Sequence, residues 1–518
     1  MKRIILLLVF TASNAFAAPN YFTRYSDTAF DHAPQGVLVG NFTGSTSLDA
    51  FVVFPTQNVI SQMSLGANGA YTLIADPNTS TIVSPYDLIA GDFNKDSHLD
   101  IYYYSNLTDA DLLTYQNISN GKVHFNSTNV STSHNNDIFD ADVNNDSNLD
   151  IISIEDNLLV FFQGNGAGAF PSFRDEEGTV VTLNKLTVSN FNADAYSDVA
   201  VTTATNKVFI YSGRAGDSIP PYPKIAILDV GHNPQGIQAG LLDNNTSQDL
   251  IVANHDDDTL SILLNDGTGT AFTATTLSVC NGPYNLVIAD FNADSKNDVA
   301  VICNADGAVN QGVLQVYAGN GDGTFVTTPI FTQNLGTNPF KIVTDDFNHD
   351  GHADLLISVT GSNKIVTLLG NKEPTLSSPL VDSTTGVFQV TYTDADNEPP
   401  SSITVTVDGT AIDMTAADST DTTYTDGKIY HATHTLAEGS HSYRFAASDG
   451  TYNAVGNPAS IVTTDQSVTV APAAAASSSG GCSLSPSPKV GEGRVRYEYW
   501  IASILVLGGA RILRKVKA

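Results

Sequence analysis

The sequence has few basic residues and very little cysteine, methionine or tryptophan. Only 23 Lys and Arg stand against 54 Asp and Glu, which gives a formal net charge of −31 at pH 7. Such a charge repels phosphates and anionic membrane surfaces, so we expect no nucleic-acid partner. Three cysteines in 518 residues exclude a disulfide-scaffold miniprotein and provide no zinc-type spacing.

Glutamate is scarce as well, because only eight of the 54 acidic residues are Glu. The chain is instead rich in Asp, Asn, Ser and Thr and has 40 glycines, all of which favour turns over helices. Hydrophobic residues make up 42% of the sequence, too much for a disordered acidic chain. The composition therefore predicts a folded, all-β protein with many tight loops.

The first residues have the features of a secretory signal peptide, which we place at residues 1–17. Lys2 and Arg3 precede an apolar run over residues 4–10, and small residues surround Ala17, where a signal peptidase would cleave. We therefore expect a secreted protein.

The C-terminal part differs in composition from the rest of the chain. Residues 471–498 are predicted to form a flexible linker that contains Gly480-Gly481-Cys482, and residues 499–518 an apolar segment with a basic tail. The apolar run is shorter than the ~20 residues of a full membrane span. One interpretation is an amphipathic tail. The other is an anchor, since the segment resembles the C-terminal sorting signals of bacterial surface proteins. That resemblance implies attachment at the cell surface or outer envelope, with membrane contact only here; whether the segment is cleaved stays open.

One segment type recurs seven times, each time as an Asp/Asn-rich loop closed by an aspartate and an apolar run. Clear copies begin at residues 92, 142, 190, 290 and 346, and degenerate copies cover residues 41–49 and 241–249. The closing aspartates are spaced 48 to 56 residues apart. They are Asp49, Asp100, Asp150, Asp198, Asp249, Asp298 and Asp354.

Each period contains about four apolar runs of strand length and no helical periodicity. One four-stranded sheet cannot bury both of its faces alone, so the copies must pack on each other and close into a ring. Residues 18–372 are therefore predicted to form a seven-bladed β-propeller. The seventh repeat stops near Gly370, and we expect residues 21–30 to supply its missing outer strand.

Residues 373–470 show a different pattern of alternating β-type residues and turns. The pattern predicts a small β-sandwich. It resembles the immunoglobulin-like modules of bacterial surface proteins.

The clear loops follow the pattern D-x-N-x-D-x-x-x-D, with side-chain oxygens at positions 1, 3, 5 and 9. Oxygen ligands at this spacing suit calcium, and we expect several structural Ca²⁺ ions. An Asx-rich hairpin without an ion is the alternative. The predicted ligands are Asp92, Asn94, Asp96, Asp100, Asp142, Asn144, Asp146, Asp150, Asn190, Asn192, Asp194, Asp198, Asp290, Asn292, Asp294, Asp298, Asp346, Asn348, Asp350 and Asp354.

The five loops are not equivalent. The loop at 346 is predicted to bind most strongly, because Gly351 at position 6 eases a left-handed turn that serine would strain by ~1 kcal/mol. The loop at 190 begins with Asn190 and has one charge fewer. The degenerate loops at 41–49 and 241–249 are expected to be empty or nearly so.

These repeats resemble the FG-GAP and VCBS repeats of integrin α-chain propellers and bacterial secreted proteins, most closely in NGPYNLVIADFNADSKNDVAV and VYAGNGDGTF. The resemblance covers residues 21–371 and implies calcium on loops at one face, with a role in adhesion or ligand binding. A monomeric propeller is expected. Cys280 and Cys303 fall in one repeat, and the sequence leaves open whether they pair or remain free thiols.

Two functions remain. The chain lacks a G-x-S-x-G elbow, an H-E-x-x-H helix and a Walker A loop. We therefore expect a non-enzymatic surface protein that binds an extracellular glycan or protein. The alternative is a metal-dependent hydrolase or lyase acting on polysaccharide. A pocket at the propeller centre with two facing carboxylates and a nearby His or Tyr would favour this alternative.

Overall fold

The structure is a computed structural model. The residues that it describes are 21–44, 47–66, 70–75, 84–105, 110–119, 122–131, 135–155, 157–175, 181–214, 223–304, 311–457 and 460–471. The predicted signal peptide and the predicted linker and anchor fall outside them, apart from Ala471. No helix in the described ranges is long and apolar enough to cross a membrane.

Seven four-stranded antiparallel sheets occupy residues 22–370, and the predicted β-propeller is confirmed in its all-β, repeated four-stranded architecture. The first four sheets are β2 (Val37–Gly40), β3 (Asp49–Phe54), β4 (Val59–Leu65), β5 (Tyr71–Ala75); β6 (Pro85–Gly91), β7 (Asp100–Ser105), β8 (Ala110–Ser119), β9 (Lys122–Ser131); β10 (Asn135–Ala141), β11 (Asp150–Glu155), β12 (Leu158–Gln163), β13 (Ser172–Asp175); and β14 (Leu183–Ser189), β15 (Asp198–Thr203), β16 (Lys207–Tyr211), β17 (Lys224–Asp229). The others are β18 (Pro234–Gly240), β19 (Asp249–Asn254), β20 (Thr259–Asn265), β21 (Phe272–Ser278); β22 (Pro283–Ala289), β23 (Asp298–Cys303), β24 (Gly312–Tyr317), β25 (Phe331–Gly336); and β26 (Pro339–Asp345), β27 (Asp354–Val359), β28 (Lys364–Gly370), β1 (Phe22–Ala29).

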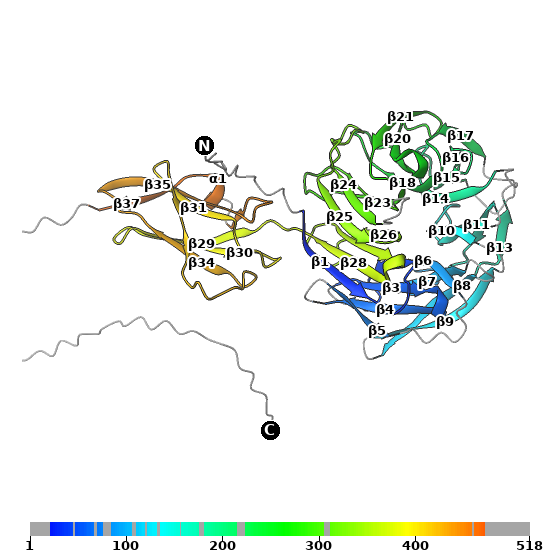
Figure 1. The fold of residues 1–518 in the computed structure, drawn as a ribbon, viewed down its shortest axis with the longest axis horizontal. Coiled ribbons are helices and arrows are strands. Elements are labelled where there is room, and N and C mark those ends of the chain that lie inside the picture. The colour runs from blue at the N-terminus through cyan, green and yellow to red at the C-terminus, as the bar shows by residue number, and fades with distance from the viewer. Residues whose placement is uncertain are drawn as a thin grey trace, which may run out of the picture. The chain divides into compact units, whose positions relative to one another are not determined.

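The sheets form a closed ring (Figure 1). The first strand of each repeat, which we call the inner strand, contacts the inner strand of the next repeat, and β26 contacts β2. The second strands β3, β11, β15, β19, β23 and β27 are buried at every position. Strands buried on both faces carry continuous apolar runs, which explains stretches such as Asp298–Cys303, DVAVIC. The core therefore lies between neighbouring sheets.

The ring closes through the N-terminal strand, as predicted. Strand β1 pairs antiparallel with β28, with Phe22 opposite Gly370 and Ala29 opposite Lys364. Lys364 Nζ also lies 2.7 Å from Asp27 Oδ2 in this pair. Because β1 comes from the start of the chain, the last sheet is completed only when the two ends of the ring meet.

Residues 375–470 form two further sheets. One contains β29 (Thr375–Asp382), β30 (Val387–Thr393), β33 (Thr415–Ala416), β34 (Lys428–Thr433) and β36 (Val455–Asn457); the other contains β31 (Ser402–Val407), β32 (Thr410–Asp413), β35 (Gly439–Ser448) and β37 (Gln466–Val470). Helix α1 (Ser460–Thr463) precedes β37. Phe388 and Tyr392 of the first sheet share a core with Val405 and Phe445 of the second. The immunoglobulin-like assignment of this part stays a prediction.

The structure pairs the two cysteines whose state the sequence left open. Cys280, just after β21, forms a disulfide with Cys303 at the end of β23, and their Cα atoms are 6.0 Å apart. The bond joins the fifth and sixth sheets.

Candidate functional site

The predicted calcium loops connect each inner strand to the second strand of the same sheet. In the loop at 92, Asp92 accepts the backbone N–H groups of Asp96 and Ser97 at 3.0 and 2.9 Å, and Asn94 Oδ1 also accepts the Asp96 N–H at 2.9 Å. The same three bonds recur in the loops at 142, 290 and 346. Position 1 therefore shapes the loop by holding two backbone donors.

Two positions of these loops have left-handed backbone. Position 6 was expected to be left-handed, and it has φ between 65° and 95° at Ser97, Ser147, Ser295 and Gly351. Position 4 is also left-handed, which the sequence did not reveal because no glycine stands there. Its residues are Lys95, Asn145, Ala193, Ala293 and His349.

The closing aspartates have a role that the sequence analysis missed. Each begins a second strand and is at most 3% exposed. Asp354, for example, accepts the Phe347 N–H from its loop and the Gly370 N–H from the third strand, both at 2.7 Å. Asp249 of a degenerate loop makes the equivalent bonds to Leu242 and Asn265 at 3.0 and 2.8 Å. This carboxylate therefore joins the strands whether or not the other ligand positions are present.

The third-strand partner is a glycine in four repeats because the backbone approaches closely there. A Cβ on Gly164 would lie 2.0 Å from the Leu149 carbonyl oxygen, and one on Gly319 would lie 2.1 Å from that of Asn297. Gly213 faces Ser197 in the same way. In these repeats glycine is thus required by the close approach of the loop carbonyl that precedes the closing aspartate.

The loops at 142, 290 and 346 bring three carboxylates into electrostatic contact. Burial, and to a smaller extent the neighbouring Asp350 and Asp346, outweigh the lowering effect of the backbone hydrogen bonds and raise the pKa of Asp354 to about 8. Burial and the aspartates at positions 5 and 1 likewise raise the pKa values of Asp150 and Asp298 to about 7. A cation would relieve this repulsion, so the donor set fits a hard divalent ion.

In the structure, the side-chain amide at position 3 donates hydrogen bonds to the carboxylates and so partly compensates their negative charge. Asn348 Nδ2 donates to Asp350 Oδ2 at 2.9 Å, and Asn94 Nδ2 lies 3.4 Å from Asp100 Oδ1. Among the described residues, no three His, Cys, Asp or Glu side chains are grouped so as to hold a metal by themselves. Calcium binding would therefore also need the amide oxygens at position 3, which the predicted ligand pattern includes.

The remaining loops differ as their sequences suggest. In the loop at 190, the Asn190 amide donates to the Asp194 carbonyl and does not accept backbone donors as Asp92 does. In the loop at 241, Leu241 is exposed at position 1. In the loop at 41, Thr43 occupies position 3 and donates to Asp49 Oδ2. Whether any loop binds calcium remains a prediction.

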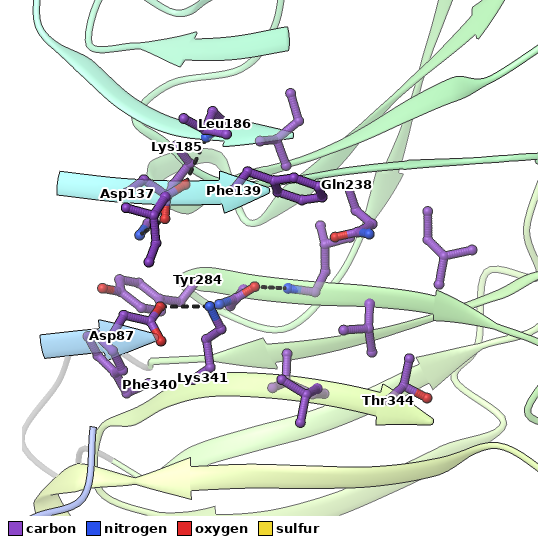
Figure 2. Close-up of a pocket in the computed structure, with 18 residues that line it drawn as sticks. Asp87, Asp137, Phe139, Lys185, Leu186, Gln238, Tyr284, Phe340, Lys341 and Thr344 are labelled. Atoms are coloured by element: carbon purple, nitrogen blue, oxygen red, sulfur yellow. Dashed lines mark hydrogen bonds and ion pairs between the residues drawn. The ribbon is translucent and has the colours of Figure 1, made fainter. Parts of the chain in front are cut away.

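A separate pocket of about 280 Å³ runs along the inner strands (Figure 2). It includes residues near the strand starts and extends along β22 and β26 as far as Ile288 and Thr344. The third residue of five inner strands lines it: Asp87, Asp137, Lys185, Asn285 and Lys341. The Asx loops follow the other ends of the same strands, so the charged residues of the pocket lie near the strand ends opposite the loops. We call this site the channel pocket.

Two ion pairs cross the channel pocket (Figure 2). Lys341 Nζ is 2.7 Å from Asp87 Oδ2, and Lys185 Nζ is 3.0 Å from Asp137 Oδ1. Burial lowers the pKa of Lys185, but Asp137, Tyr284 and Asp87 outweigh it, and the net shift is upward. Lys185 is thus held protonated.

The Lys341–Asp87 pair joins the seventh sheet to the second sheet, across the first sheet that lies between them in the ring. Gly36 permits this, since a Cβ there would lie 2.6 Å from Asp87 Oδ1. The aromatic rings of Tyr86, Tyr284 and Phe340 pack beside the pair, with centroids 5.3 Å apart for Tyr86–Phe340 and 6.0 Å for Tyr284–Phe340. The sequence feature from which the channel pocket could have been found is the residue at the third position of each inner strand.

The channel pocket contains the two carboxylates and the tyrosine that would favour an enzyme, but both carboxylates are engaged. Asp87 accepts the Leu88 N–H through Oδ1 and Lys341 through Oδ2. Asp137 accepts Lys185 through Oδ1 and the Leu186 N–H through Oδ2. Each of these oxygens already accepts one hydrogen bond, so the ion pairs and backbone bonds fix the orientation of both carboxylates.

We predict that Lys341→Met lowers the stability of the propeller by about 3–5 kcal/mol, because it leaves the 3% exposed Asp87 carboxylate unpaired. The matched control is Lys364→Met, which removes the pair to the more exposed Asp27 and should cost about 0–1 kcal/mol. Thermal unfolding of both variants measures the difference. Equal losses would show that the Lys341–Asp87 pair has no special weight.

Comparisons with known proteins agree with the repeats. The model of the FG-GAP-like repeat matches residues 242–301 and 290–357. No curated protein matches the chain. Similar solved structures include BBS1N in complex with ARL6DN, soaked with lead or with mercury. Each has 9% identity and a TM-score of 0.48; they cover 68% and 67% of this chain and 98% and 96% of the solved chain. The chain thus carries FG-GAP-like repeats in an all-β fold of repeated four-stranded sheets.

Proposed function

We propose that the protein is a secreted, non-enzymatic binding module in which calcium stiffens a propeller that binds an extracellular glycan or protein. The observation that carries the proposal is the channel pocket, where polar and aromatic side chains converge from six strands of a closed ring. Pockets with few convergent polar groups on a rigid frame are typical of ligand sites.

Calcium would act structurally in this proposal. The predicted ligands in the loops at 92, 142, 290 and 346 share one hydrogen-bond pattern, and the loop at 190 would bind more weakly. The ion would supply charge compensation for the carboxylates at positions 1, 5 and 9. The chain's own part is to hold the ends of the inner and second strands together.

Secretion and surface attachment belong to the same proposal. The Cys280–Cys303 disulfide supports an oxidising compartment. The signal peptide and the C-terminal anchor are predictions from sequence, and the two-sheet part at residues 375–470 would serve as an immunoglobulin-like stalk.

Binding of the full chain to a glycan array and to extracellular matrix proteins, with calcium and with EDTA, tests the proposal. We expect saturable binding that EDTA weakens, and no release of reducing ends from a panel of polysaccharides. Calcium-dependent cleavage of any polysaccharide in the panel would contradict the proposal and favour the hydrolase or lyase alternative.

A further inference from the structure

We propose that the channel pocket binds one neutral sugar ring, which makes it the contact point for a glycan ligand. This inference rests on the proposed binding function and narrows it to a ligand class and a site. Neither the Asx loops nor the FG-GAP resemblance identifies this pocket, whose charged residues lie near the starts of the inner strands.

The size of the pocket limits the ligand. Its volume of about 280 Å³ lies just below the ~300 Å³ at which pockets for drug-sized ligands begin. One monosaccharide unit is a suitable occupant, whereas a folded peptide segment is not. A sugar at the end of a chain can enter a pocket of this kind while the rest of the glycan stays outside.

The charges of the pocket favour a neutral ligand. Lys341 pairs with Asp87 and Lys185 pairs with Asp137, so the charged lining sums to zero. A charged ligand would have to break a pair or bring a buried charge without a partner, and both cost free energy. Hydroxyl groups, in contrast, can add hydrogen bonds to ion pairs that stay intact.

Several polar groups in the pocket have hydrogen-bonding capacity to spare. Within the part of the chain that the structure describes, the Gln238 amide and the Tyr284 hydroxyl have no hydrogen-bond partner, and both line the pocket (Figure 2). Lys341 Nζ donates to Asp87 and retains two further N–H donors. These donors and acceptors match the paired hydroxyls of a sugar.

Aromatic side chains supply the apolar part of such a site. Tyr284, Phe340 and Phe139 line the pocket together with the polar groups. The C–H face of a sugar ring packs on aromatic rings, while the hydroxyl edge faces the polar side chains. Because these residues stand on inner strands of the closed ring, they are held in place before a ligand arrives.

The test is titration of the calcium-loaded full chain with single sugars, followed by saturation-transfer NMR and calorimetry. The neutral probes are glucose, galactose, mannose and N-acetylglucosamine; the charged probes are glucuronic acid and N-acetylneuraminic acid. The variants are Gln238→Leu and Tyr284→Ala. The matched control is Gln235→Leu on the same strand, whose amide bonds Asn233 outside the pocket.

We expect at least one neutral sugar to bind, with an affinity that falls at least about tenfold in Gln238→Leu and Tyr284→Ala, or about 1.4 kcal/mol, and stays within about twofold in Gln235→Leu. Melting curves of all variants establish that they fold. Binding of charged probes alone, or neutral binding that both variants leave unchanged, overturns the inference.

The array experiment distinguishes a wrong binding site from a wrong binding function. If the full chain binds glycans or proteins and Gln238→Leu binds them equally well, the binding function stands and the channel pocket is not its site. If no probe and no array ligand binds, both the function and the site are wrong.

Discussion

Removing calcium with EDTA should lower the melting temperature of the propeller by on the order of 10 °C. Each occupied loop contributes about 2.7 kcal/mol when free calcium is 100 times its dissociation constant, and four loops share the full ligand pattern. The physical reason is the charge gathered in each loop: burial, together with the neighbouring Asp350 and Asp346, raises the pKa of Asp354 to about 8, and a bound cation would compensate this charge. Differential scanning calorimetry at millimolar calcium and after chelation measures the shift.

Two controls tie the effect to the loops. Asp350→Asn should reduce the calcium-dependent shift, whereas Asp243→Asn, in the loop where Leu241 replaces the first ligand, should leave it unchanged. Magnesium should restore little of the stability, because the smaller ion prefers near-octahedral geometry and retains its water. A melting temperature that is the same with calcium and with EDTA would contradict calcium binding by all of the loops.

The ring could be predicted from the sequence because its repeats are local. Each repeat carries its own Asp-rich loop and strand-length runs, so a spacing of about 50 residues is visible in one chain. The closing strand was predictable for the same reason: the last repeat stops at Gly370, and residues 22–29 resemble the strand that it lacks. Local turn chemistry also predicted the left-handed conformation of Ser97 and its equivalents.

The channel pocket could not be predicted in this way, because its residues come from different repeats. Lys341 and Asp87 are 254 residues apart, and Lys185 and Asp137 are 48 apart. The repeats resemble one another in their loops and core, but the third residue of the inner strand is charged in β6, β10, β14 and β26, an amide in β22 and apolar or glycine in β2 and β18. Which of these residues pair depends on the closed ring and on the space left at Gly36.

The repeats thus share the residues that hold the sheets together and differ in the residues that line the channel pocket. The closing aspartate recurs in all seven because every sheet needs its backbone bonds, including the sheets whose loops lack other ligands. The lining of the channel pocket has no such constraint, since only Gly36 and Gly236 meet a neighbouring backbone there. A variable ring on a uniform frame is the arrangement that permits specific recognition.

Because the closing aspartate joins the strands of its sheet by hydrogen bonds, its removal should cause a large loss of stability. Asp249→Ala should destabilise the propeller by about 2–5 kcal/mol, because it leaves the buried N–H groups of Leu242 and Asn265 without their acceptor. Asp249 is fully buried and lies in a loop that is expected to hold no ion, so the loss should be the same with calcium and with EDTA. Thermal unfolding in both conditions measures it.

Asp243→Ala is the matched control, since its carboxylate bonds only within the same loop, to Asn245. It should change the stability far less than Asp249→Ala. If the loss in Asp249→Ala disappeared after chelation, the carboxylate would act through a bound ion, and the loop at 241 would have to be counted among the calcium sites. If the loss persists, the hydrogen bonds alone account for an aspartate at this position in every repeat.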